Sequence, residues 1–97
     1  MSTEVVPQLT RRRPRSFVEW RQLRTWAKLP RREENIAGFL LRDAREDTGL
    51  TQTQLAEKLG ISQQAVARAE RWAANPTVRF MVRWANACSR HLEIRLE

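Results

Sequence analysis

The 97-residue sequence predicts a small all-α domain, and three observations lead to this fold class. Apolar residues recur at helical spacing in five stretches of the chain. A serine or threonine stands before three of these stretches, where its hydroxyl can cap a helix. Only three glycines and four prolines interrupt the chain, and 41% of its residues are hydrophobic, which is enough for the core of one domain.

The first helix is predicted from Phe17 to Lys28. Ser16 and Glu19 form a capping box at its start, and Pro30 disfavours helix beyond its end. Its apolar face holds Phe17, Trp20, Leu23, Trp26, Ala27 and Leu29. This face either packs on the rest of the domain or binds a protein partner.

Four further helices and a strand are predicted after it. The helices span residues 35–48, 52–59 and 63–72, and a last helix begins after residues 75–77, Asn-Pro-Thr. Residues 91–97 alternate apolar and polar side chains, which predicts a short β-strand. A lone strand is not stable in water, and of the possible pairing partners we favour a second copy of the chain, which gives a two-fold dimer. The predicted dimerisation residues are Leu92, Ile94 and Leu96.

Residues 50–70, LTQTQLAEKLGISQQAVARAE, carry the functional signal. They predict two short helices joined at Gly60, which allows the positive φ that a tight turn needs. In such a helix-turn-helix the second helix enters the major groove of DNA. Glutamine can pair with adenine and arginine with guanine, and alanine can touch a thymine methyl. The predicted base-reading residues lie on the exposed side of the second helix: Gln63, Gln64, Ala67 and Arg68.

The charge distribution also indicates a polyanionic partner. The formal net charge is +7, and the whole excess lies in residues 1–32. We interpret residues 1–15 as a flexible basic arm that follows the DNA backbone or enters a minor groove, the alternative being that its arginines only confer solubility. A second positive stretch, residues 52–90, surrounds the helix-turn-helix. The predicted phosphate contacts are Gln52, Ser62, Arg71, Asn75, Thr77, Arg79, Arg11, Arg12, Arg13 and Arg15.

At these residues the chain resembles the XRE-like family of Cro and phage-repressor helix-turn-helix proteins. The resemblance covers roughly residues 36–88 and implies a bundle of about five short helices, here with an extra N-terminal helix, that binds a palindromic operator as a dimeric repressor. One departure is that Arg-Trp-Ala-Ala follows Glu70, where the family often has Asn-Gly. The resemblance is carried by Leu50-Thr51-Gln52, Leu55-Ala56, Leu59-Gly60-Ile61-Ser62, Val66, Glu70 and Pro76.

The predicted organisation is a basic arm at 1–15, a helix and linker at 16–34, a DNA-binding domain at 35–90 and a dimerisation strand at 91–97. An enzyme is not expected, because one histidine, one cysteine and no tyrosine offer no nucleophile-base pair; neither a metal nor a cofactor is predicted. No apolar run approaches the roughly 20 residues of a membrane span, and no signal peptide precedes the arginines. A cytoplasmic protein is therefore expected.

An antitoxin is the alternative function. Such a protein would bind a toxin through Trp20 and Trp26 and regulate its own operon, and the strand-like tail resembles the endings of small antitoxin-type regulators. A segment that masks a basic nuclease is expected to be acidic, whereas residues 1–32 are strongly basic. The charge therefore argues against that kind of toxin and leaves others open.

Overall fold

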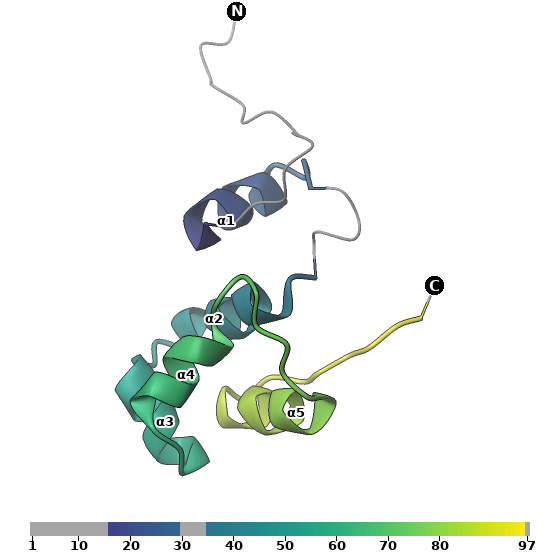
Figure 1. Ribbon diagram of the computed structural model, residues 1–97. Helices are drawn as coiled ribbons and strands as arrows, with labels where there is room; N and C mark the ends of the chain where they lie inside the picture. The colour runs from purple at the N-terminus through teal and green to yellow at the C-terminus, as the bar shows by residue number, and fades with distance from the viewer. Residues whose placement is uncertain (1–15, 30–34, 97) are drawn as a thin grey trace, which may run out of the picture. The chain divides into compact units, whose positions relative to one another are not determined.

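The computed structural model describes residues 16–29 and 35–96, and within these residues it contains five α-helices (Figure 1). The chain divides between Ile36 and Ala37 into two units, which are described separately. The basic arm predicted at 1–15, with Arg11, Arg12, Arg13 and Arg15, lies outside the described residues. The helices are α1 (Phe17–Thr25), α2 (Ala37–Asp47), α3 (Gln52–Leu59), α4 (Gln63–Ala69) and α5 (Val78–Ala87).

The first unit contains α1, which begins at the predicted cap. The hydroxyl of Ser16 accepts a hydrogen bond from the amide of Glu19. The helix ends three residues before the predicted end at Lys28, because Ala27 takes a left-handed conformation with φ 54°. The amide of Lys28 then donates to the carbonyl of Leu23, so the helix ends before the chain reaches Pro30. The apolar face is buried at Phe17, Trp20 and Leu23.

The second unit has its core between α2, α3, α4 and α5. Trp84 of α5 is fully buried at its centre, and its indole N–H donates to the carbonyl of Leu41, 2.9 Å away. Burying a tryptophan with its one donor satisfied adds apolar contact at no polar cost. The fully or nearly fully buried residues of this core are Leu41, Leu55, Ala56, Leu59, Val66, Trp84 and Cys88.

The start of α2 lies directly against the end of α4. A Cβ on Gly38 would come within 2.1 Å of the carbonyl oxygen of Arg71 and 3.0 Å of that of Ala69. No real side chain tolerates such a distance, so glycine is what allows this approach. The contact fixes where the chain goes after the predicted recognition helix.

Three of the fold predictions need correction. Residues 91–96 form no strand with any described residue, because the pairing that a strand requires is absent within this part of a single chain. The five helices include α1, so the second unit has four helices where the resemblance implied about five. Residues 90–96 contain no further helix. The helix predicted over 63–72 ends at Ala69, with Glu70 as its C-cap.

Candidate nucleic-acid interface

The turn between α3 and α4 is formed by local hydrogen bonds. Thr51 and Gln54 make a complete capping box at the start of α3, and Gly60 ends that helix with φ 69°. The amide of Ile61 donates to the carbonyl of Ala56, which completes the turn. The hydroxyl of Ser62 then caps α4. The sequence therefore forms the predicted pair of short helices joined by a tight turn, and the second of them ends earlier than predicted, at Ala69.

The structure places the predicted base-reading residues on one helix, α4. Gln63, Gln64 and Arg68 are exposed, and Ala67 is half-buried between them. Val66 is fully buried on the opposite side of the helix. The amide and guanidinium groups that can recognise base edges thus project from the outer face while α4 is anchored through its inner face.

The side chain of Gln63 is hydrogen-bonded to the side chain of Gln52, the first residue of α3. Its Nε2 donates to Oε1 of Gln52 at 2.6 Å. Nε2 of Gln52 in turn donates to Oε1 of Glu70 at 3.0 Å. A predicted phosphate-contacting residue and a predicted base-reading residue are therefore joined by one hydrogen bond, and a buried carboxylate orients both.

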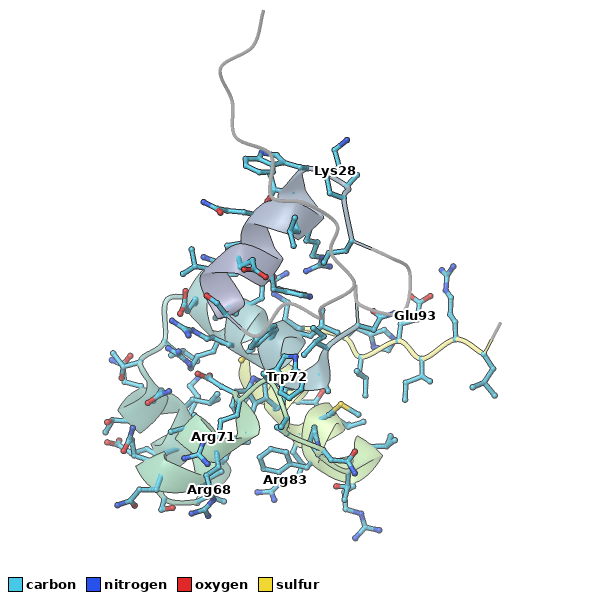
Figure 2. The ribbon with its side chains drawn as sticks, turned by 45° about the horizontal axis from the view of Figure 1, so that its top comes forward. Lys28, Arg68, Arg71, Trp72, Arg83 and Glu93 are labelled. Atoms are coloured by element: carbon cyan, nitrogen blue, oxygen red, sulfur yellow. The ribbon has the colours of Figure 1, made fainter. Side chains whose placement is uncertain are left out.

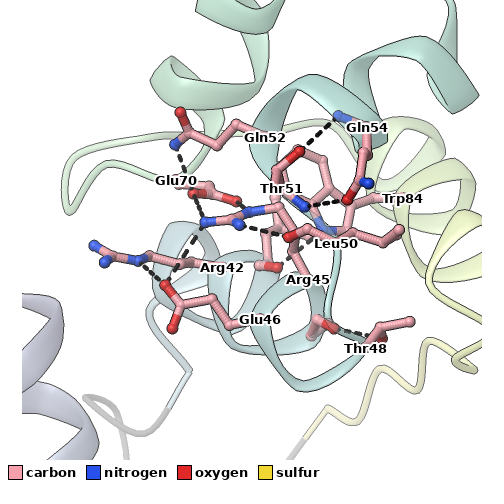
Figure 3. A network of polar contacts seen from close by, with 12 residues as sticks. Arg42, Arg45, Glu46, Thr48, Leu50, Thr51, Gln52, Gln54, Glu70 and Trp84 are labelled. Carbon is pink, nitrogen blue, oxygen red and sulfur yellow. Dashed lines mark hydrogen bonds and ion pairs between the residues drawn. The ribbon is translucent and has the colours of Figure 1, made fainter.

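That carboxylate belongs to a buried ion pair, shown with its network in Figure 3. Nε of Arg45 donates to Glu70 at 2.5 Å and its Nη2 at 3.0 Å, while Nη1 donates to the carbonyl of Leu50 at 2.8 Å (Figure 3). The hydrogen bond to Glu70 raises the pKa of the Arg45 guanidinium. Because both side chains are buried and the ion pair is bidentate, it ties the last turn of α2 to the C-cap of α4.

Sequence reasoning missed this pair, although a signal for it was present. Arg45 follows Leu41 by four residues, and Glu70 follows Val66 by four residues. Each charged residue therefore lies on the buried face of its helix, where an unpaired charge is costly. One charge of each sign in such positions indicates a buried ion pair between two helices.

Because Glu70 is paired and buried, the exposed side chains of residues 52–90 carry a larger positive excess than the sequence count suggests. The stretch has six basic and two acidic side chains, and with Glu70 buried only Glu57 remains as an exposed acid. Among the described residues, Arg68, Arg71 and Arg79 take part in no ion pair. Figure 2 labels Arg68 and Arg71 on α4 and the segment after it.

Other polar residues around the interface already have structural roles. Arg83 donates to the carbonyl of Leu59 at the end of α3, 2.7 Å away. The hydroxyl oxygens of Ser62 and Thr77 accept backbone amides as caps of α4 and α5. Asn75 is exposed in the loop between these helices. Phosphate contact by Ser62, Asn75 and Thr77 stays a prediction.

Among residues 16–29 and 35–96 there is no group of three or more histidine, cysteine, aspartate or glutamate side chains that could hold a metal ion. No helix in the same ranges is long and apolar enough to cross a membrane.

Two short helices joined by a tight turn, the second with amide and guanidinium side chains on its exposed face, are typical of helix-turn-helix DNA-binding proteins. The sequence pattern of the helix-turn-helix family matches residues 41–94, more than half of the chain. The chain belongs to this family, in its XRE-like branch, whose members are DNA-binding transcriptional regulators.

One relative comes from Methanothermobacter thermautotrophicus and is described as an uncharacterized HTH-type transcriptional regulator. It is 36% identical over 55 residues, which cover 56% of this chain and 80% of the relative. No solved structure matches the chain significantly.

Proposed function

We propose that this protein is a transcriptional repressor that binds a palindromic operator as a dimer, with α4 in the major groove. The observation that supports this most is the hydrogen bond between Gln52 and Gln63, which holds the first turns of α3 and α4 together on one exposed surface. In this arrangement Gln52 meets a phosphate while Gln63 meets the edge of the adjacent base pair.

The specificity of binding resides in a few side chains on α4. Gln63 and Gln64 read adenine, Arg68 reads guanine, and Ala67 contacts a thymine methyl. Arg71, Asn75, Thr77 and Arg79 follow α4 and hold the neighbouring phosphates, as does Ser62 before it. The arm, with Arg11, Arg12, Arg13 and Arg15, adds affinity that does not depend on sequence.

A dimer follows from the size of the reading surface. Each α4 covers a few base pairs, so two copies related by a two-fold axis would read two half-sites about one helical turn apart. Selection of bound sites from random double-stranded DNA tests this directly. We expect an inverted repeat with that spacing, whereas enrichment of a single half-site or of no motif would contradict it.

The roles of individual arginines are separable, because Arg68 and Arg79 are both exposed and carry the same charge. Arg68→Ala is expected to cost about 1–3 kcal/mol of binding free energy and to relax preference at one base pair. Arg79→Ala is expected to weaken binding to all sequences alike and to lower the salt slope by about one. Fluorescence anisotropy titrations against operator variants measure both effects. An unchanged ranking of variants for Arg68→Ala would contradict its role.

The arm is tested by deletion of residues 1–15. Binding should weaken across sequences and depend less steeply on salt, because up to four phosphate contacts are lost. An unchanged slope would contradict the role of the arm.

For the antitoxin alternative, Trp20 is fully buried and Trp26 is half-buried. No structural observation favours that function over the regulator.

A further inference from the structure

The exposed charges of α1 lie beside its buried aromatic residues. Arg21 and Arg24 are exposed and three positions apart, so they are neighbours on the helix surface. Glu19, the acid among residues 16–29, precedes them by two and five positions, whereas side chains that face each other on a helix are three or four apart. Lys28, labelled in Figure 2, adds a third positive charge just beyond the helix. Adjacent like charges on α1 therefore have no acid at a facing position of the same helix.

The two arginines are held by the aromatic rings one turn before them. The guanidinium carbon of Arg21 lies 4.7 Å from the ring centroid of Phe17, and that of Arg24 lies 5.2 Å from the ring centroid of Trp20. In such stacking the guanidinium uses its face, while its N–H groups point outward in its plane. The contact thus restricts the side chains without using the edge that pairs with a phosphate, and this lowers the entropy cost of binding one.

We propose that the basic surface of α1, formed by Arg21, Arg24 and Lys28, binds the phosphate backbone of duplex DNA beside the half-site that α4 reads. The planar fork of an arginine matches the geometry of a phosphate. Like charges three positions apart repel each other on an isolated helix, and a row of phosphates relieves this repulsion. The proposal rests on the proposed function, since it adds a second contact to the same DNA.

The burial of the apolar face of α1 favours nucleic acid over a membrane. A basic helix that lies on an anionic bilayer inserts its apolar face between the lipids. In α1 this face is covered, because Phe17 is 6%, Trp20 0% and Leu23 4% exposed. Val18 is the one large apolar side chain that α1 exposes. The surface therefore offers charge and little apolar area to a partner, which suits a phosphate backbone.

The covalent link between the two units makes this second contact effective. Residues 26–36 connect α1 to α2, and a segment of this length reaches at most about 40 Å when fully extended. One turn of DNA is about 34–36 Å long, so the phosphates within reach lie within about one turn of the half-site. Once α4 is bound, the second contact is intramolecular, and even a weak one adds to the affinity of the whole chain.

The salt dependence of binding tests this surface in the full-length chain. Arg21→Gln/Arg24→Gln removes two charges, so the slope of log K against log salt concentration should fall by about 1.8, and the loss of affinity between about 50 and 200 mM salt should become about tenfold smaller. Arg21→Lys/Arg24→Lys keeps both charges and should retain the wild-type slope. Lys28→Gln leaves the stacked arginines in place and should lower the slope by about 0.9. Fluorescence anisotropy should give the same differences on duplexes of random sequence and on a selected site, because phosphates carry no sequence information.

A matched control removes the same charge elsewhere in the chain. Arg90→Gln/Arg95→Gln acts in the C-terminal tail, residues 90–96, where these arginines pair with Asp47 and Glu93. This variant should leave the slope unchanged. An equal fall of the slope in the control would show that overall charge and not the surface of α1 is the cause.

A wild-type slope for Arg21→Gln/Arg24→Gln, with circular dichroism showing that its helices are intact, would overturn the proposal. The proposed function fails in a different way. A palindrome that is selected while the slope stays unchanged would reject the surface of α1 alone. A lowered slope without any selected motif would support this surface and reject the proposed operator alone.

Discussion

The helix-turn-helix and the C-terminal tail differ in where their stability comes from. In α3 and α4 the caps, the turn and the ion pair of Arg45 with Glu70 all lie within one unit. In the tail, Ile94 and Leu96 are exposed, and residues 91–96 pair with no other described backbone segment. The helices of the reading surface are thus held by contacts within one unit, whereas the described tail is held at its start, where Arg90 pairs with Asp47. Variants in the network and at the joint between α5 and the tail test this difference.

The largest effect is expected from Arg45→Met. The substitution leaves the carboxylate of Glu70 buried without its partner, which typically costs about 3–5 kcal/mol of unfolding free energy. Denaturation by urea measures this cost. Arg42→Met is the matched control, because Arg42 pairs with Glu46 at i,i+4 near the surface, where such a pair contributes about 0.3–0.5 kcal/mol.

The Arg45→Met/Glu70→Gln double variant separates charge from packing. It removes both buried charges and keeps an acceptor for Gln52, so it should recover part of the lost stability. If Arg45→Met cost no more than Arg42→Met, the buried pair would not hold α2 to α4.

A smaller effect is expected from Gly38→Ala. Its Cβ would meet the carbonyl oxygen of Arg71 at 2.1 Å, so the segment after α4 must move, at a cost of about 1–3 kcal/mol. Gly49→Ala is the control: nothing lies within 4 Å of its Cβ, and the strain comes from φ alone. NMR amide shifts should change at residues 69–74 for Gly38→Ala and not for Gly49→Ala. Shifts confined to α2 would contradict the contact.

The joint between α5 and the tail should tolerate a stabilising change. Ser89 ends α5 in a left-handed conformation, which costs a residue with a Cβ about 1–2 kcal/mol. Ser89→Gly removes this strain but adds chain entropy to the unfolded state, so a net gain of about 0.5–1 kcal/mol is expected in urea denaturation. Ser89→Ala keeps the strain and should bring no gain. Equal stabilities of the two variants would show that the strain is not the cause.

The helix ends illustrate what the sequence can predict. Gly49 and Gly60 are glycines in left-handed conformation, and residue type alone predicts both positions. Ala27 and Ser89 end their helices in the same way, but these residue types do not favour that conformation, so the early end of α1 was missed.

The site was predictable to a similar degree. Capping and apolar spacing predicted α3 and α4 and the exposed side of α4, because helices satisfy their hydrogen bonds within the segment. The network from Arg45 through Glu70 and Gln52 to Gln63 joins residues up to 25 positions apart. The strand prediction was wrong for the described residues of a single chain, because the alternation of apolar and polar residues identifies the two sides of a strand but not its pairing partner.

The smallest effect concerns Cys88, which caps the end of α5 just before the tail. Burial raises the pKa of its thiol above the ordinary value of 9.0, against the opposing charges of Arg45 and Lys58. Since the folded pKa is the higher one, the thiol stabilises the fold fully below the unfolded pKa. That contribution declines as pH rises through this range, because the unfolded chain ionises first.

The stability difference between wild type and Cys88→Ala should therefore be constant near neutral pH and shrink above pH 9.0, by at most about 1.4 kcal/mol per pH unit. Urea denaturation of both proteins across this range isolates the thiol, since every other titrating group is shared. A difference that does not change with pH would show that the thiol ionises alike in both states. Cys88 would then be accessible where α5 meets the tail, and the anchored start of the tail would be open to solvent.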